Sequence, residues 1–153
     1  MRVQNWLLCL ALLAAAPVAE AANRYDCAAD DAVLRLALDV EFSADTGGKL
    51  THFRGGYVLK DKLQPSALRA LTLDSGMLTQ RWNDDDRLLM RLYQQAQEKP
   101  PFGTLDMTIA VAAGAEGAPW DGTYALTVAT APDTASKPAV QLQKRGKIAC
   151  SPR

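Results

Sequence analysis

The single histidine is the first residue whose type could support catalysis. An unperturbed imidazole titrates near neutral pH, so His52 could act as a general base. It lies in a segment with strand-like alternation, beside Arg54 on the predicted polar face. The chain has no G-x-S-x-G motif to supply a nucleophile at a strand-to-helix turn. The sequence therefore favours an ordinary surface histidine, and a hydrolase that combines His52 with convergent carboxylates is the alternative.

The densest acidic run is Asp84-Asp85-Asp86, a type of cluster that can bind a divalent cation. A calcium loop of the EF-hand type needs a central glycine and a closing glutamate at fixed spacing, and neither follows this run. A structural zinc site takes four Cys or His ligands, which one histidine and two oxidised cysteines do not supply. We therefore predict a solvated hairpin turn here, with no metal site and no cofactor.

Three aromatic residues are the candidates for binding a partner. Trp82 and Trp120 each lie at a strand end or in a loop, and Phe102 lies in the loop Lys99–Gly103. A large ring in such a place either fills the core or contacts a partner, and core filling is the favoured interpretation for the tryptophans. An exposed ring would be a candidate anchor, because aromatic residues dominate binding hot spots.

The N-terminal stretch predicts export from the cytoplasm. Arg2 gives a basic start, Trp6–Ala16 is an unbroken apolar run of about 11 residues, and Ala19-Glu20-Ala21 is a small-residue triplet. This is the pattern of a signal peptide cleaved after the triplet, and the run is shorter than the roughly 20 residues that span a bilayer. We therefore expect residues 1–21 to be removed and residues 22–153 to form one domain, in the periplasm or outside the cell.

Export also decides the chemistry of the cysteines. Cys9 would be removed with the signal peptide, which leaves Cys27 and Cys150 near the two ends of the mature chain. In an oxidising compartment such a pair predicts a disulfide, whereas redox and metal sites usually use cysteines that are close in sequence. Closing so long a loop is worth roughly 4–5 kcal/mol in the chain-entropy model.

Alternation with a period of two dominates the mature chain. Between Val33 and Phe42, apolar residues occupy every second position, which indicates a half-buried strand because side chains alternate across a pleated sheet. The pattern recurs between turn-forming segments such as Asp45-Thr46-Gly47-Gly48. A short helical turn is expected near residues 65–71. About eight strands are predicted, over residues 24–28, 33–43, 49–60, 71–82, 86–95, 103–112, 121–131 and 139–150. The segment 71–82 is expected as one strand or as two pieces, Leu71–Asp74 and Met77–Trp82, that are separated by the Ser75-Gly76 break.

The predicted fold is all-β and antiparallel. The first and last predicted strands carry Cys27 and Cys150, so a disulfide would place these two strands side by side. An antiparallel sheet whose first and last strands meet forms a closed barrel, which removes exposed edges. We therefore predict a closed or nearly closed barrel, with a two-sheet sandwich that holds both terminal strands in one sheet as the alternative.

Charge and hydropathy narrow the range of partners. The chain has 17 Lys and Arg residues and 17 Asp and Glu residues, for a formal net charge of +0. Signal cleavage would remove one residue of each sign, Arg2 and Glu20, so the balance persists. A balanced surface argues against binding to nucleic acid or to anionic membranes. After cleavage no apolar run is long enough to cross a bilayer as a helix, and the oligomeric state is left open.

The two ends of the mature chain resemble a known family in outline. The start Arg24-Tyr25-Asp26-Cys27 and the end Ile148-Ala149-Cys150 are similar to those of the small periplasmic lysozyme-inhibitor barrels, which join a Tyr-x-Cys start to a C-terminal cysteine. The interior lacks that family's short Ser/Gly-rich inhibitory loop, so no site residues are carried over. The resemblance implies inhibition of a cell-wall hydrolase as one special case of binding.

The sequence supports three functional hypotheses. The first is a non-enzymatic exported binding protein, because the domain is small, rich in strands and without a catalytic motif. The second is the small hydrolase that uses His52 and carboxylates. The third is a structural accessory of the cell envelope with an exposed apolar sheet face. A hydrolase needs a pocket of convergent polar groups, whereas a binding protein would expose Trp82, Trp120 or Phe102.

Overall fold

The chain folds as an all-β protein in a computed structural model. The structure describes residues 24–43, 48–60, 66–84, 86–96, 102–133 and 135–153, so the predicted signal peptide lies outside the described residues. The nine strands are β1 (Arg24–Asp30), β2 (Leu34–Ser43), β3 (Lys49–Leu59), β4 (Ala70–Asp74), β5 (Leu78–Asp84), β6 (Arg87–Ala96), β7 (Phe102–Ala112), β8 (Trp120–Ala131) and β9 (Ala139–Pro152).

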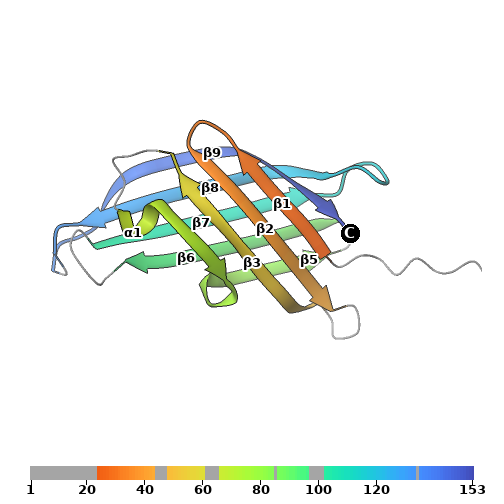
Figure 1. Cartoon of the computed structure of the whole chain (residues 1–153), viewed down its shortest axis with the longest axis horizontal. Coiled ribbons are helices and arrows are strands. Elements are labelled where there is room, and N and C mark those ends of the chain that lie inside the picture. Colours follow the sequence, from red (N-terminus) through yellow and green to blue (C-terminus); the bar gives the residue numbers. More distant parts are fainter. Residues whose placement is uncertain (1–23, 44–47, 61–65, 85, 97–101, 134) are drawn as a thin grey trace, which may run out of the picture.

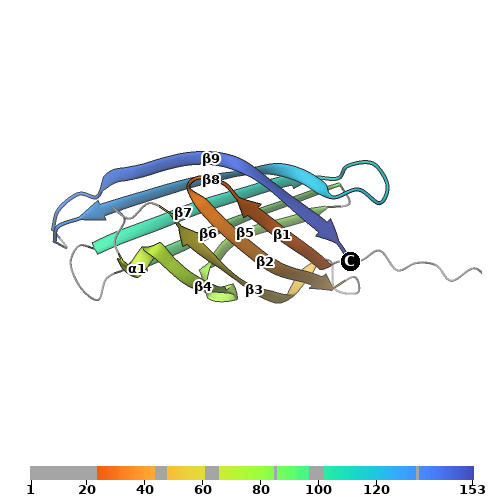
Figure 2. The same cartoon turned by 45° about the horizontal axis from the view of Figure 1, so that its top comes forward.

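All nine strands belong to one antiparallel sheet. Their order across the sheet is β4-β3-β2-β1-β9-β8-β7-β6-β5, so the two ends of the chain meet in the middle. The sheet bends over on itself, and β1, β2 and β3 cross above β6, β7 and β8 at an angle (Figure 1). The turned view shows the long β9 at the bend between these two parts of the sheet (Figure 2). The core fills the space enclosed by the bend.

The alternation of the sequence explains which side chains form this core. On β2 the apolar residues from Leu34 to Phe42 are buried at every second position, and the residues between them face outward. The same alternation holds on β6, β7 and β8, as expected where one face of a sheet packs on the core and the other faces solvent. The inner faces predicted for these four strands are therefore confirmed.

The predicted helical turn is also present, as α1 (Ser66–Arg69). Its Leu68 is fully buried and packs under the sheet, and the phenol of Tyr57 donates a hydrogen bond to the Leu68 carbonyl at 3.0 Å. Burial raises the pKa of the Tyr57 phenol, which therefore remains a donor at every physiological pH. The contact fixes α1 against β3 at one end of the core.

The terminal strands lie side by side and are joined covalently, as predicted. Cys27 of β1 is the register partner of Cys150 of β9, and their Cα atoms are 3.9 Å apart. A disulfide with an S–S distance of 2.00 Å links them. Both cysteines are buried, so the disulfide is part of the packed core.

The sheet is not closed into a barrel, and that prediction is wrong. The predicted strand 71–82 is interrupted by the 3-10 helix η1 (Ser75–Met77), where the Asp74 carboxylate accepts a hydrogen bond from the Gly76 N–H at 2.8 Å. β4 therefore pairs with β3, and β5 pairs with β6, but β4 and β5 do not pair with each other. Because the terminal strands β1 and β9 pair in the middle of the sheet, the two unpaired edges of the sheet are β4 and β5, on either side of this break. The sandwich alternative fails as well, because a single sheet contains every described strand.

Candidate functional site

The structure places the three aromatic candidates in three different environments. Trp82 on β5 is 62% exposed, whereas Trp120 at the start of β8 is 9% exposed. Trp120 packs on Tyr25, with ring centroids 5.0 Å apart, so it fills the core beside the disulfide. Phe102 at the start of β7 is half-buried and lines a different hollow from Trp82. The three residues do not form one site, and Trp82 alone projects a large ring into solvent.

Trp82 has an apolar neighbour that the hairpin register provides. In the β5–β6 pair, Trp82 lies directly opposite Leu89, which is itself 41% exposed. Leu88 and Met90, the neighbours of Leu89 in sequence, face the core, so Leu89 must face outward. The other two large apolar residues that are exposed in the described chain, Val58 and Val140, lie on β3 and β9.

Polar groups surround this apolar pair on the outer face of the sheet. Gln80 and Arg91 are register partners two residues along the strands from the Trp82–Leu89 pair, and Thr108 of β7 lies opposite Arg91. We call the five residues Gln80, Trp82, Leu89, Arg91 and Thr108 the Trp82 patch. They line a shallow hollow of about 320 Å³, together with Arg81 and Met90.

Arg91 is held in place by an ion pair with Asp106. The guanidinium donates from Nε to Oδ1 at 2.9 Å and from Nη2 to Oδ2, which is the bidentate arrangement that fixes both partners. The hydrogen bond that Arg91 donates to Asp106 raises the pKa of Arg91 above its ordinary value. The Trp82 patch therefore combines an exposed aromatic ring, an aliphatic side chain and an oriented cation whose charge is already balanced.

Phe102 lines a second hollow further along the outer face of β6 and β7. Its volume is about 340 Å³, and its wall includes Tyr93, Thr104 and Asp133. The Tyr93 hydroxyl accepts a hydrogen bond from the Gln95 side chain at 2.7 Å. Hydrogen bonds that Ser136 and Ala135 donate to Asp133 hold the pKa of its carboxyl below the ordinary value. This hollow contains the half-buried ring of Phe102 and a carboxylate, but the ring of Phe102 is less exposed to solvent than that of Trp82.

His52 lies on the outer face of β3, next to a carboxylate that has another partner. Its Nε2 is 3.4 Å from Oδ2 of Asp39 on β2. Arg24 donates to both oxygens of Asp39, at 2.9 Å and 2.6 Å, and this hydrogen bond is the main cause that lowers the pKa of the carboxyl. Within the part of the chain that the structure covers, no hydroxyl or thiol donates to His52. The cluster is an Arg24–Asp39 ion pair between β1 and β2 with the imidazole of His52 on β3 beside it, and it has no positioned nucleophile among the described residues.

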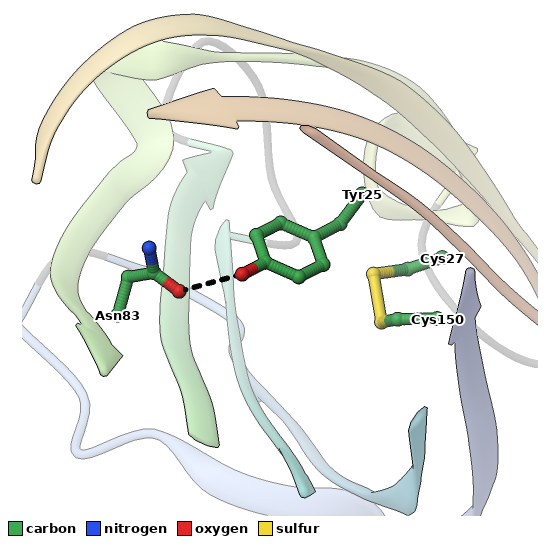
Figure 3. The surroundings of a disulfide bond; sticks show 4 residues. All are labelled: Tyr25, Cys27, Asn83 and Cys150. Carbon is green, nitrogen blue, oxygen red and sulfur yellow. Dashed lines mark hydrogen bonds between the residues drawn. A yellow bond between two sulfur atoms is a disulfide. The ribbon is translucent and has the colours of Figure 1, made fainter. Parts of the chain in front are cut away.

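The surroundings of the disulfide join the two parts of the bent sheet. Figure 3 shows Tyr25 beside the sulfur atoms of Cys27 and Cys150, with its hydroxyl directed at Asn83. The Tyr25 hydroxyl donates a hydrogen bond to the Asn83 Oδ1 at 3.1 Å. Because Tyr25 belongs to β1 and Asn83 to β5, this bond crosses the core from the centre of the sheet to its edge.

The residues that the structure describes contain neither a metal-binding cluster nor a membrane-spanning helix. These residues contain no group of three or more His, Cys, Asp or Glu side chains placed to hold a metal ion. The acidic run of residues 84–86 begins with the last residue of β5 and ends just before β6, and its central residue is outside the described chain. No described helix is long and apolar enough to cross a membrane.

Comparisons with known proteins give no family to which the chain could be assigned. No protein-family model matches the chain, no curated protein matches it, and no solved structure matches its fold. The resemblance of the two ends to lysozyme inhibitors is thus without support from a relative.

Sequence reasoning missed Leu89 and the Arg91–Asp106 pair as parts of the candidate site. A signal for Leu89 was available, because alternation on β6 places this leucine on the polar face with Arg91 and Tyr93. The ion pair depends on the register between β6 and β7, in which Arg91 and Asp106 are diagonal neighbours. That register could not be obtained from either strand alone.

Proposed function

We propose that this chain is a non-enzymatic exported binding protein that contacts another protein through the Trp82 patch. The observation that carries the proposal is the exposed ring of Trp82 next to the exposed side chain of Leu89. Tryptophan and arginine are enriched in the residues that dominate protein interfaces, and the patch holds one of each. Arg91 is already oriented by Asp106, so little of its side-chain entropy would be lost on binding.

The disulfide supports the exported location. Disulfides persist in oxidising compartments and are rare in the cytosol, so the Cys27–Cys150 bond fits a periplasmic or secreted protein. The signal peptide over residues 1–21 remains a sequence prediction. Mass spectrometry of the protein from the producing cells tests it, because cleavage after Ala21 gives a defined mass.

Capture from a periplasmic extract tests the binding proposal. The oxidised mature chain is immobilised as wild type, Trp82→Ala, Leu89→Ala and Val58→Ala. Val58 is 44% exposed on another strand, so its variant is a control for the loss of an exposed apolar side chain. We expect one stoichiometric protein to be retained by wild type and Val58→Ala, and to be lost from the other two variants. Equal retention by all four forms would exclude the Trp82 patch as the contact.

Inhibition of a cell-wall hydrolase is the special case that the terminal resemblance favours. The retained partner would then digest purified cell walls, and the mature chain would slow that digestion. The Trp82→Ala variant should lose the inhibition and Val58→Ala should keep it. A partner without muralytic activity would remove this special case and leave the binding function standing.

A hydrolase centred on His52 is the second candidate, favoured by the 3.4 Å approach of His52 to Asp39. It is weaker because Arg24 already engages both oxygens of Asp39. A panel of ester, amide and glycoside substrates tests it with wild type and His52→Gln. Turnover that His52→Gln abolishes would reverse the order of the two candidates. An envelope accessory would need a broader apolar face than the pair of Trp82 and Leu89.

A further inference from the structure

One side of β9 has no strand partner over most of its length. On its other side β9 pairs with β8 from Ala139 to Cys150. Its pairing with β1 covers Ala149 to Pro152, because β1 diverges from β9 beyond that point. Residues 139–148 therefore present a row of backbone N–H and C=O groups that no other described strand satisfies. Such a row is a template on which a further strand can pair.

This free edge also carries three cations that form no ion pair with another described residue. Lys144, Arg145 and Lys147 are exposed, and none forms an ion pair within the described chain. By contrast, Arg24 at the start of β1 and Lys60, which follows β3, form ion pairs with Asp39 and Asp30. Asp31 attracts Lys144, but it already accepts hydrogen bonds from Tyr124 and two backbone amides. The edge thus has a local positive charge on a chain whose net charge is zero.

The charge decides which strand the edge can accept. A second copy that paired along the whole of residues 139–148 in antiparallel register would bring these three cations close to their counterparts, and like charges on facing strands are destabilising. Lysine on an edge strand commonly prevents such self-association. The same cations attract a strand of opposite charge. The positive charge of the edge therefore disfavours pairing with a second copy of the chain and favours pairing with an acidic strand. Val140, which is 61% exposed, adds an apolar contact at the start of the edge.

We propose that residues 139–147 of β9 are a docking edge for an extended acidic segment of another protein. The segment adds as a strand to the free side of β9, so that backbone hydrogen bonds supply affinity and the three cations select acidic side chains. This surface is separate from the Trp82 patch, which lies on β5, β6 and β7. It extends the proposed function by a second contact and does not depend on the first.

Peptide binding to the oxidised mature chain, followed by fluorescence anisotropy, tests the proposal. The probe is a labelled nine-residue peptide that alternates glutamate with valine. One control replaces glutamate by lysine, and a second keeps the glutamates but methylates alternate backbone nitrogens. We expect the acidic probe to bind and each control to bind at least about tenfold more weakly, because one lacks the charge and the other lacks the backbone donors.

Matched charge variants test whether the acidic peptide binds at β9. The variant Lys144→Glu/Arg145→Glu/Lys147→Glu should lose at least about tenfold in affinity for the acidic probe and gain affinity for the lysine peptide. The control Lys49→Glu/Arg54→Glu/Arg87→Glu changes the net charge equally on other strands, and should bind as wild type does. Arg145→Glu alone serves if the triple variant is not folded, and it should weaken binding in the same direction.

Three results would overturn the proposal. They are equal binding of the acidic and the N-methylated peptides, equal losses in the two triple variants, and no binding of the acidic probe. Hydrogen exchange of the backbone amides gives a further readout, because a docked strand should slow exchange within residues 139–147. Trp82→Ala should leave peptide binding unchanged, so a failure of the docking edge is distinguishable from a failure of the Trp82 patch.

Discussion

The phenol of Tyr124 donates a hydrogen bond to Oδ2 of Asp31, a residue 93 positions earlier in the chain. Tyr124 is fully buried on β8, and Asp31 lies in the turn between β1 and β2. The other carboxylate oxygen accepts from the N–H groups of Val33 and Leu34 at 2.7 Å and 2.9 Å. One side chain therefore shapes the turn and also ties it to the opposite part of the bent sheet.

Removal of the phenol oxygen should destabilise the fold. Tyr124→Phe keeps the ring and leaves Asp31 without its buried donor, so we expect the free energy of unfolding to fall by about 1–3 kcal/mol. Urea denaturation measures the change. Tyr93→Phe is the matched control, because its hydroxyl hydrogen-bonds an exposed glutamine, and it should change stability by less than about 0.5 kcal/mol. Equal effects of the two substitutions would show that the link to Asp31 is not stabilising.

Asp31 should also give the protein a characteristic acid sensitivity. Desolvation by burial raises the pKa of its carboxyl, but hydrogen bonds from Tyr124, Leu34 and Val33 outweigh it and hold the pKa below the ordinary value. Such a group contributes its full stabilisation above the unfolded pKa of about 3.9, and loses it as the pH falls through the folded pKa. Asp31→Asn should therefore be less stable than wild type at pH 7, and the gap should narrow below about pH 4.

The comparison between wild type and Asp31→Asn isolates this carboxyl. Asp30 and Asp39 also have lowered pKa values, caused first by hydrogen bonds from Lys60 and Arg24, and both forms retain them. Urea denaturation from pH 7 down to pH 2 gives both curves. A gap that stays constant over this range would contradict the assignment.

The disulfide should be the largest single contribution of the terminal strands to stability. Cys27 and Cys150 are 123 residues apart in sequence, and a link across so long a loop is worth roughly 4–5 kcal/mol in the chain-entropy model. Cys27→Ser/Cys150→Ser should lower Tm by about 10–20 °C under oxidising conditions. Reduced wild type should melt together with this variant. If oxidised and reduced wild type melt at the same temperature, the disulfide does not stabilise the fold.

Local alternation was sufficient to predict most of the strands. Each inner face depends on a period of two that any single strand shows, and Leu34 to Phe42 is the clearest example. The open edge could not be predicted in this way. It depends on the Asp74 carboxylate, which caps η1 and turns the chain, and on the fact that β4 and β5 then pair with different neighbours.

The candidate site was predictable in part. The β5–β6 hairpin closes at the pair of Asp84 and Arg87, and counting back from this pair places Trp82 opposite Leu89. The different exposures of Trp82 and Trp120 were not predictable, because they depend on which face each strand turns to the core after the sheet bends. The free side of β9 likewise requires knowledge of where β1 stops pairing with it.

Leu36→Asp tests the orientation of β2, on which the inner face of the sheet depends. The Leu36 side chain is 1% exposed, so the substitution would bury a carboxylate without a partner. We expect a loss of at least about 4 kcal/mol, which leaves little folded protein. Ala37→Asp is the matched control, because Ala37 is the next residue and is exposed, and it should cost less than about 1 kcal/mol. Near-ultraviolet circular dichroism and urea denaturation distinguish the two variants. A folded Leu36→Asp beside an unfolded Ala37→Asp would mean that the two faces of β2 are exchanged, since a shift of one residue turns every side chain of a strand to the other face.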